Sequence, residues 1–127
     1  MSAVRKPTVA VVGASADRSK YSNKSVRAHL ARGYEVFPVN PREETIEGLK
    51  VYRSVLDIPV PLDRISVYLS PAVGVKVLEE FARKGAKEIF LNPGSESEEL
   101  IEKAQSLGLA PIVACSITDL GLSSGQL

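Results

Sequence analysis

The chain has 127 residues, of which 44% are hydrophobic and 24% charged, a composition that fits one globular domain and excludes a disordered protein. No apolar run reaches the roughly 18 residues of a membrane span, and the start, MSAVRKP, lacks a secretory signal's apolar segment. A single cysteine, Cys115, excludes an intramolecular disulfide and a cysteine zinc cluster. We therefore expect one domain over residues 1–127, located in the cytoplasm.

The net charge of +1 is unevenly distributed along the sequence. Residues 1–42 hold eight lysines and arginines but only two acidic residues, a local charge of +6, so the remainder carries −5. A nucleic-acid-binding protein usually has a broader basic face. The asymmetry therefore indicates a local anionic partner for the first third of the chain and no nucleic acid.

The first half of the chain predicts two buried strands around a helix. Residues 9–13 form an apolar run without alternation, which is typical of a central strand covered on both faces. A helix capped by Ser22 or Asn23 should follow and end at Gly33, and residues 34–39 predict the second strand. In the less regular region that follows, we expect an edge strand over residues 50–52 and a helical turn capped by Ser54.

The second half alternates strands and helices more clearly. Strands are predicted over residues 63–69, 87–91 and 109–114. One helix should start at Ser70-Pro71 and end at Gly85, and the next, capped by Ser95 or Ser97, should end at Gly108. The first of these helices carries an apolar stripe that we expect to pack entirely on the sheet: Val73, Val77, Leu78 and Phe81. Residues 116–127 are expected to be a partly mobile tail.

This alternation predicts an α/β fold of three layers, with a mainly parallel sheet of five or six strands and helices on both faces. In such sheets, ligands bind beyond the carboxyl ends of the strands. Here those ends are short turns of small or polar residues and proline: Gly13-Ala14-Ser15, Asn40-Pro41-Arg42, Ser70-Pro71 and Asn92-Pro93-Gly94.

The first of these turns has the chemistry of an anion-binding loop. Gly13 permits close approach to the backbone, and the small residues Ala14 and Ser15 leave its N–H groups open to a phosphate. Arg18 and Lys24 lie near the start of the helix, where cations oppose the helix dipole and a bound polyanion would reverse that cost. We expect phosphate binding here; the alternative is a solvated basic loop.

Other chemistries find less support in the sequence. The turn after the first strand has one of the three glycines of the dinucleotide fingerprint, although Arg42 keeps an NADP-dependent enzyme as an alternative. It also lacks the second glycine of a nucleophile elbow. His29 is expected to be a surface or half-buried residue without a catalytic role, and no metal-ligand cluster is evident. Cys115 is interpreted as a small buried side chain, with a redox or thiol-contact role left open.

Two sequence segments together, VAVVGAS and GYEVFPVNP, with later strands ending in Ser-Pro and Pro-Gly, resemble the small single-domain CoA-binding proteins. These are similar to the CoA-binding domain of the succinyl-CoA synthetase α subunit and of ADP-forming acyl-CoA synthetases. The resemblance covers residues 6–118. It implies a Rossmann-like domain that holds coenzyme A at the strand ends.

The resemblance also assigns parts of the ligand to the loops. Gly13, Ala14 and Ser15 would line the diphosphate, and Asn40, Pro41 and Arg42 would form a second wall, with Arg42 or Lys24 near a phosphate. Ser70 and Pro71 would lie near the adenine, and Asn92, Pro93 and Gly94 near the pantetheine. The synthetases' phosphorylated histidine and nucleotide-grasp fold have no counterpart in residues 1–127, so the resemblance implies a CoA or acyl-CoA-binding module without evident catalysis. A regulatory module with a vestigial pocket is a further alternative, and a protein partner or homo-oligomer is left open.

Overall fold

Five parallel strands form the central sheet of the molecule, as the apolar runs predict. The computed structural model describes residues 5–127; residues 1–4, on which the expectation of no secretory signal partly falls, lie outside it. The sheet has the order β2-β1-β5-β6-β7, and all its neighbouring strands are parallel. The strands are β1 (Thr8–Val12), β2 (Glu35–Val39), β5 (Leu62–Val67), β6 (Ala86–Leu91) and β7 (Ile112–Val113).

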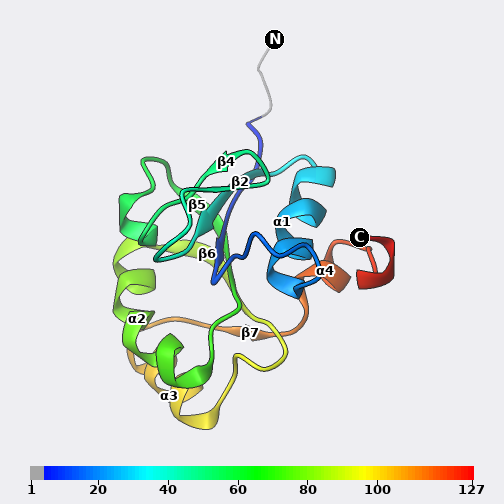
Figure 1. Ribbon diagram of the computed structural model, residues 1–127. Coiled ribbons are helices and arrows are strands. Elements are labelled where there is room, and N and C mark those ends of the chain that lie inside the picture. Colours follow the sequence, from blue (N-terminus) through cyan, green and yellow to red (C-terminus); the bar gives the residue numbers. More distant parts are fainter. Residues whose placement is uncertain (1–4) are drawn as a thin grey trace.

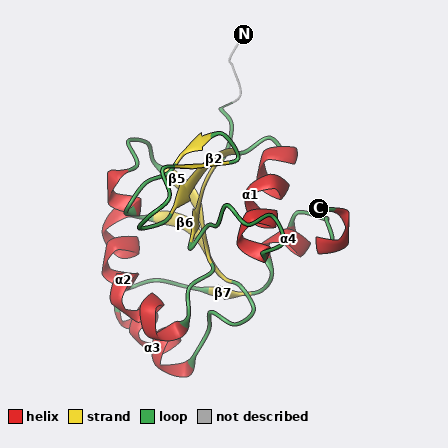
Figure 2. Cartoon of the chain, viewed as in Figure 1, coloured by secondary structure: helices red, strands yellow, loops and turns green. Residues whose placement is uncertain are grey.

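Helices cover both faces of this sheet (Figures 1 and 2). One face carries α1 (Tyr21–Ala31) and α4 (Ser116–Asp119), and the other carries α2 (Pro71–Lys84) and α3 (Glu98–Ser106). Since the central strands are buried on both sides, two apolar clusters form, one against each helical layer. The predicted three-layer, doubly wound, Rossmann-like fold is confirmed. No helix within residues 5–127 is long and apolar enough to cross a membrane.

The irregular region after β2 folds as a small hairpin and a helical turn. Its strands are β3 (Thr45–Ile46) and β4 (Leu49–Lys50), so the edge strand predicted over residues 50–52 is displaced toward the N-terminus. Tyr52 still makes an isolated parallel bridge to Val39. The predicted cap is confirmed, because the Ser54 side chain accepts a hydrogen bond from Leu56 N at the start of η1 (Val55–Asp57).

The predicted caps of α1 are wrong. The helix begins at Tyr21 after Lys20, and Asn23, expected as a cap, lies inside it with no exposed surface. The Asn23 amide instead donates to Ser15 O at 2.9 Å, and its oxygen accepts from Arg27 Nε at 2.8 Å. A long-range contact to the preceding loop therefore overrides the local capping preference of this side chain.

The C-terminal part of the chain differs most from expectation. The strand predicted over residues 109–114 shortens to β7, because Leu109 N still bonds to Ala104 O at the end of α3. Residues 116–127, expected to be a partly mobile tail, are folded into α4 and a second short helix, η2 (Ser124–Gln126). Ile117 and Ser116 of α4 are fully buried against the sheet and α1. Apolar burial thus fixes the first part of this segment.

The helix caps give a stability prediction with a matched control. Ser97 accepts a hydrogen bond from Leu100 N at 3.1 Å, whereas Ser70 caps α2 without a side-chain hydrogen bond. We expect Ser97→Ala to lower the free energy of unfolding by about 1 kcal/mol. Ser70→Ala should change it by less than about 0.5 kcal/mol, since no cap is lost. Urea denaturation of both variants measures this, and equal losses would contradict the assignment.

Candidate functional site

The carboxyl ends of β1 and β5 meet where the strand order of the sheet reverses. The chain passes from β1 outward to β2, then crosses back to β5 on the other side of β1. Gly13 follows β1 with φ +84°, and a Cβ there would lie 2.6 Å from Tyr68 O. Only glycine fits both the backbone angle and the space. Such a reversal is the usual ligand-binding position of open α/β sheets.

The loop after β1 uses part of its hydrogen-bonding capacity internally. Gly13 N and Ala14 N both donate to Val39 O, at 3.0 and 3.1 Å, and Ala14 is buried. These two N–H groups, expected to face a phosphate, are therefore already satisfied. Within residues 5–127, no acceptor pairs with the N–H of Ser15 or Ala16. The donors open to an anion are thus shifted one or two residues along the loop.

Asn40 joins this loop to the end of β2. Its amide donates to Ala14 O at 2.8 Å, and its oxygen accepts from Arg42 N at 2.7 Å and Glu43 N at 2.9 Å. Asn40 is therefore first a structural link between the two predicted walls of the site. Arg42 and Pro41 are exposed next to it.

The basic residues of the first third are only partly free for a ligand. Lys24 Nζ donates to Ser124 O at 3.2 Å, and Arg32 Nε donates to Leu120 O at 2.9 Å. Arg18 is exposed and lies 3.5 Å from Glu47 Oε2. The basic residues therefore fall into two groups. Lys24 and Arg32 hold the C-terminal segment, whereas Arg18 and Arg42 are exposed to solvent near the loops.

A first pocket, which we call the α2-side pocket, opens between the ends of β1 and β2 and helix α2. Its volume is about 230 Å³ and its walls are mostly apolar. Val73 and Val77 line it, so the expectation that the α2 stripe packs wholly on the sheet is wrong; Val73 is 45% exposed. Arg53 lies at the same pocket, held by hydrogen bonds from Nη1 to Asn40 O and Glu43 O. The other lining residues include Gly13, Val39, Asn40, Pro41, Val55, Leu69 and Phe81.

A second pocket, the α1-side pocket, lies beyond the carboxyl ends of β5, β6 and β7, next to the start of α1 and to α4. Its volume is about 410 Å³, and its lining mixes apolar and hydroxyl groups: Tyr21, Tyr68, Pro93, Cys115, Ile117, Thr118 and Ser124. Burial raises the pKa of the Tyr68 phenol, whose oxygen lies 3.3 Å from Ser116 Oγ. Cys115 is only half-buried, so its interpretation as a buried side chain is wrong.

The remaining predicted site residues play unequal parts. Asn92 is fully buried; its amide donates to Ser66 Oγ and Val67 O, and its oxygen accepts from Ser116 N. It fixes the strand ends and α4 and has no surface for a ligand. Pro93 lines the α1-side pocket, while Gly94 is exposed and its N–H faces Glu96. Ser70 and Pro71 begin α2 and line neither pocket.

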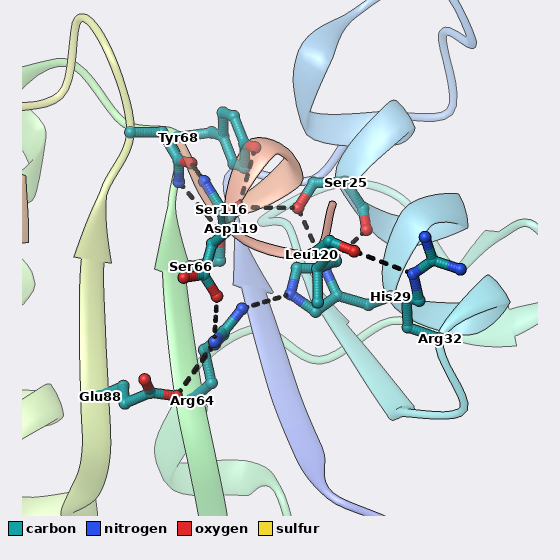
Figure 3. A network of polar contacts seen from close by, with 11 residues as sticks. Ser25, His29, Arg32, Arg64, Ser66, Tyr68, Glu88, Ser116, Asp119 and Leu120 are labelled. Carbon is teal, nitrogen blue, oxygen red and sulfur yellow. Dashed lines mark hydrogen bonds and ion pairs between the residues drawn. The ribbon is translucent and has the colours of Figure 1, made fainter. Parts of the chain in front are cut away.

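His29 lies fully buried in the core, whereas a surface or half-buried position was expected (Figure 3). Its Nδ1 lies 2.8 Å from Ser25 O, to which it donates, and its Nε2 lies 3.4 Å from Arg64 Nη1, from which it accepts. Burial, aided by the Arg64 charge, lowers the His29 pKa from 6.5 to about 4. The neutral imidazole is thus a structural bridge between α1 and β5. No cluster of metal-binding side chains occurs within residues 5–127.

Comparison with known proteins decides the family. Residues 7–120 match the family model described as a CoA binding domain. The chain belongs to the CoA-binding domain family. Subunit alpha of the ADP-forming acetate–CoA ligase I of Pyrococcus furiosus is 36% identical to this CoA-binding domain over 119 residues, which cover 80% of the chain and 26% of the ligase subunit. Subunit alpha of ligase II from the same organism is 33% identical over 115 residues, covering 80% of the chain and 24% of that subunit.

Solved structures agree with this assignment. A conserved hypothetical protein from Pyrococcus furiosus superposes on the CoA-binding domain with a TM-score of 0.80 at 36% identity, covering 91% of this chain and 99% of that one. By contrast, the chain spans only 11 to 26% of the length of the curated acetate–CoA ligases named above and of a similar one from Methanocaldococcus jannaschii. The resemblance drawn from the loop sequences is therefore confirmed at the level of the family.

Several pocket residues of this CoA-binding domain were not predicted from the sequence. Val73 could have been predicted as a pocket residue, because it lies in the first turn of α2, close to the ends of the strands. Tyr68 could also have been predicted as a pocket residue, because it directly follows β5. Thr118 and Ser124 gave no signal, since their place depends on how residues 116–127 fold back.

Proposed function

We propose that this protein binds coenzyme A, or an acyl-CoA, across the carboxyl edge of its sheet and is a binding module without a reaction of its own. One observation carries the proposal: two pockets flank the contact between Gly13 and Tyr68 at the reversal of strand order. The adenosine half would occupy the α2-side pocket and the pantetheine half the α1-side pocket. The diphosphate would cross the loop after β1.

The α2-side pocket supports an adenine base by its apolar walls. Val55, Val73 and Val77 face it, and burying a flat aromatic ring among such side chains is favourable at about 25 cal/mol per Å² of apolar surface. A phosphate would find little compensation among these valines, and the carboxylate of Glu80, which lines the same pocket with Arg53, would repel it. The ring of the ligand, not its phosphates, therefore fits this pocket.

Phosphate groups find donors just outside the two pockets. The N–H groups of Ser15 and Ala16 lie in the loop after β1, and Arg18 follows them. Arg42 and Arg53 lie on the side of the α2-side pocket, where a 3′-phosphate on the ribose would emerge. Arginine suits this role because its guanidinium offers several fixed donors. The predicted site residues Gly13, Ser15, Arg18, Asn40, Pro41 and Arg42 thus keep their proposed role, while Ala14 and Asn92 shape the loops.

Binding without catalysis is supported by the position of the histidine. The α1-side pocket, where we expect the thiol of the ligand, is lined by hydroxyl groups and the half-buried Cys115 and not by a histidine. His29, the only histidine of the chain, is held in the core as a neutral bridge. A phosphohistidine mechanism of the kind implied for larger synthetases would need an exposed imidazole. The domain would then serve larger assemblies or the CoA pool by holding its ligand.

A charge placed in the α2-side pocket gives the direct test. We expect Val73→Glu to weaken CoA binding by about tenfold or more, because the carboxylate would lie under the adenine and near phosphates. Val113→Glu is the matched control: Val113 is 52% exposed on β7 and lines neither pocket. Isothermal titration with CoA and with dephospho-CoA measures both variants, and dephospho-CoA should bind the wild-type protein more weakly.

Two results would reject the proposal. The first is an absence of heat and of any thermal shift when wild-type protein meets millimolar CoA. The second is an equal loss of affinity in Val73→Glu and Val113→Glu, which would mean that the α2-side pocket is not where adenine binds. Binding of NADP as tight as that of CoA would favour the nicotinamide alternative.

A further inference from the structure

We infer that residues 121–127, which we call the C-terminal strap, form a wall of the α1-side pocket that grips the pantetheine end of the ligand. The inference rests on the proposed function, because it takes CoA as the ligand and places its pantetheine half in this pocket. Figure 1 shows the strap, in red, beside α1 and α4.

The strap lies outside the residues that match the family model. The match to the CoA binding domain ends at residue 120, and the strap follows directly. Its residue Ser124 nevertheless lines the α1-side pocket, together with Thr118 of α4 and Tyr21 at the start of α1. The matched domain therefore supplies most of the pocket, and the strap adds one side of it.

The strap is held to the domain by Lys24 of α1 and by Arg32, which directly follows that helix. Arg32 Nε donates to Leu120 O at 2.9 Å where the strap begins, and Lys24 Nζ donates to Ser124 O at 3.2 Å near its middle. Gly121 turns the chain with φ +77°, and Leu122 N bonds back to Ile117 O. The strap residues themselves are exposed or half-buried. Since few apolar groups are buried, these hydrogen bonds carry the docking, and the strap opens at low cost.

Lys24 connects the strap to the ligand. Its ammonium group has three donors, of which one reaches Ser124 O, while Nζ lies 5.6 Å from the centre of the Tyr21 ring. Tyr21 and Ser124 both line the pocket. Asn23, the residue before Lys24, donates to Ser15 O in the loop after β1, so a diphosphate at this loop would lie close to a lysine that already holds the strap. Ligand binding and strap docking then favour each other, and this coupling is reciprocal.

The two halves of the ligand allow a clean experiment. Coenzyme A reaches both pockets, but adenosine 3′,5′-bisphosphate lacks the pantetheine and reaches only the α2-side pocket. We expect Ser124→Trp to fill part of the α1-side pocket and weaken CoA binding by about tenfold, with no more than a twofold effect on the bisphosphate. Ser106→Trp, on the exposed end of α3, is the matched control and should bind both compounds as the wild type does.

A second variant and a structural measurement guard against misfolding. Arg32→Gln removes the hydrogen bond at the start of the strap without touching either pocket, and should weaken CoA binding about threefold while sparing the bisphosphate. In the wild-type protein, amide hydrogen exchange of residues 122–127 should slow with CoA and stay unchanged with the bisphosphate. Thermal melts identify any variant that is not folded.

Each outcome has a separate meaning. If the wild-type protein binds neither compound, the proposed function fails. If it binds CoA but folded Ser124→Trp and Arg32→Gln proteins bind CoA normally, the strap inference is overturned while the proposed function stands. Equal losses for CoA and the bisphosphate, or no change in hydrogen exchange with CoA, would also overturn it.

Discussion

Replacing Gly13 with alanine is expected to lower the free energy of unfolding by about 3 kcal/mol and to abolish measurable CoA binding. Two costs combine at this position. The backbone φ of +84° disfavours any side chain, and the new Cβ would lie 2.6 Å from Tyr68 O, a backbone atom that moves only if β5 moves. Relief of the contact would separate the ends of β1 and β5, and with them the two pockets.

Gly33→Ala separates these two costs. Gly33 has nearly the same φ, +82°, but no atom lies within 4 Å of a Cβ built there. The Gly33→Ala substitution should lower the free energy of unfolding by only about 1 kcal/mol, which is the cost of the left-handed backbone angle for alanine. Urea denaturation of both variants and calorimetry with CoA provide the measurements. A loss in Gly13→Ala no greater than in Gly33→Ala would show that the close approach to Tyr68 is not a constraint.

Acidification should destabilise the protein through His29. In the unfolded chain His29 takes up a proton near pH 6.5, whereas in the folded protein its pKa is about 4. Between these values the unfolded state binds more protons, so the free energy of unfolding falls as pH falls. The expected contribution is about 1.4 kcal/mol per pH unit and about 3 kcal/mol in all. Above pH 6.5 both states are neutral and this dependence disappears.

The variant His29→Gln isolates this effect. Glutamine does not titrate, so the variant should lose the part of the pH dependence between 6.5 and 4 that His29 causes. Neighbouring charges remain in both proteins: Arg64 Nη2 lies 2.7 Å from Asp119 Oδ2 and 3.1 Å from Glu88 Oε1. The difference between the free energies of unfolding of the two proteins, measured from pH 8 to pH 4, gives the contribution of His29. Parallel profiles would mean that the pKa of His29 is the same in the folded and unfolded states, and would contradict the prediction.

Much of the fold could be predicted from the sequence because its strands are buried on both faces. An unbroken apolar run of this length, such as that of β1, is typical of a buried strand in a globular domain, and glycines such as Gly33 and Gly85 mark the helix ends. The errors arose where a distant partner decides the local structure. The Asn23 amide donates to Ser15 O in the loop before α1, and His29 is buried where it accepts a hydrogen bond from Arg64 of β5.

The site could be predicted only to the level of its loops. The rule that ligands bind at strand ends located Gly13, Asn40, Pro41 and Pro93, all of which line a pocket. It could not tell which polar groups are already paired, so Asn92 and the N–H of Ala14 were counted as free. Hydrogen-bond partners across the sheet edge are a tertiary property that spacing along the chain does not encode.

The close contact between Gly13 and Tyr68 makes the edge of the sheet a ridge with a hollow on each side. On the proposed function, a ligand that straddles this ridge behaves as a bivalent one. Once one half is seated, the other is confined near its own hollow at a high effective concentration, and the two weak halves together hold far more tightly than either alone. Damage to one side then leaves the other half anchored, so the protein tolerates sequence change in either hollow more readily than at the ridge between them.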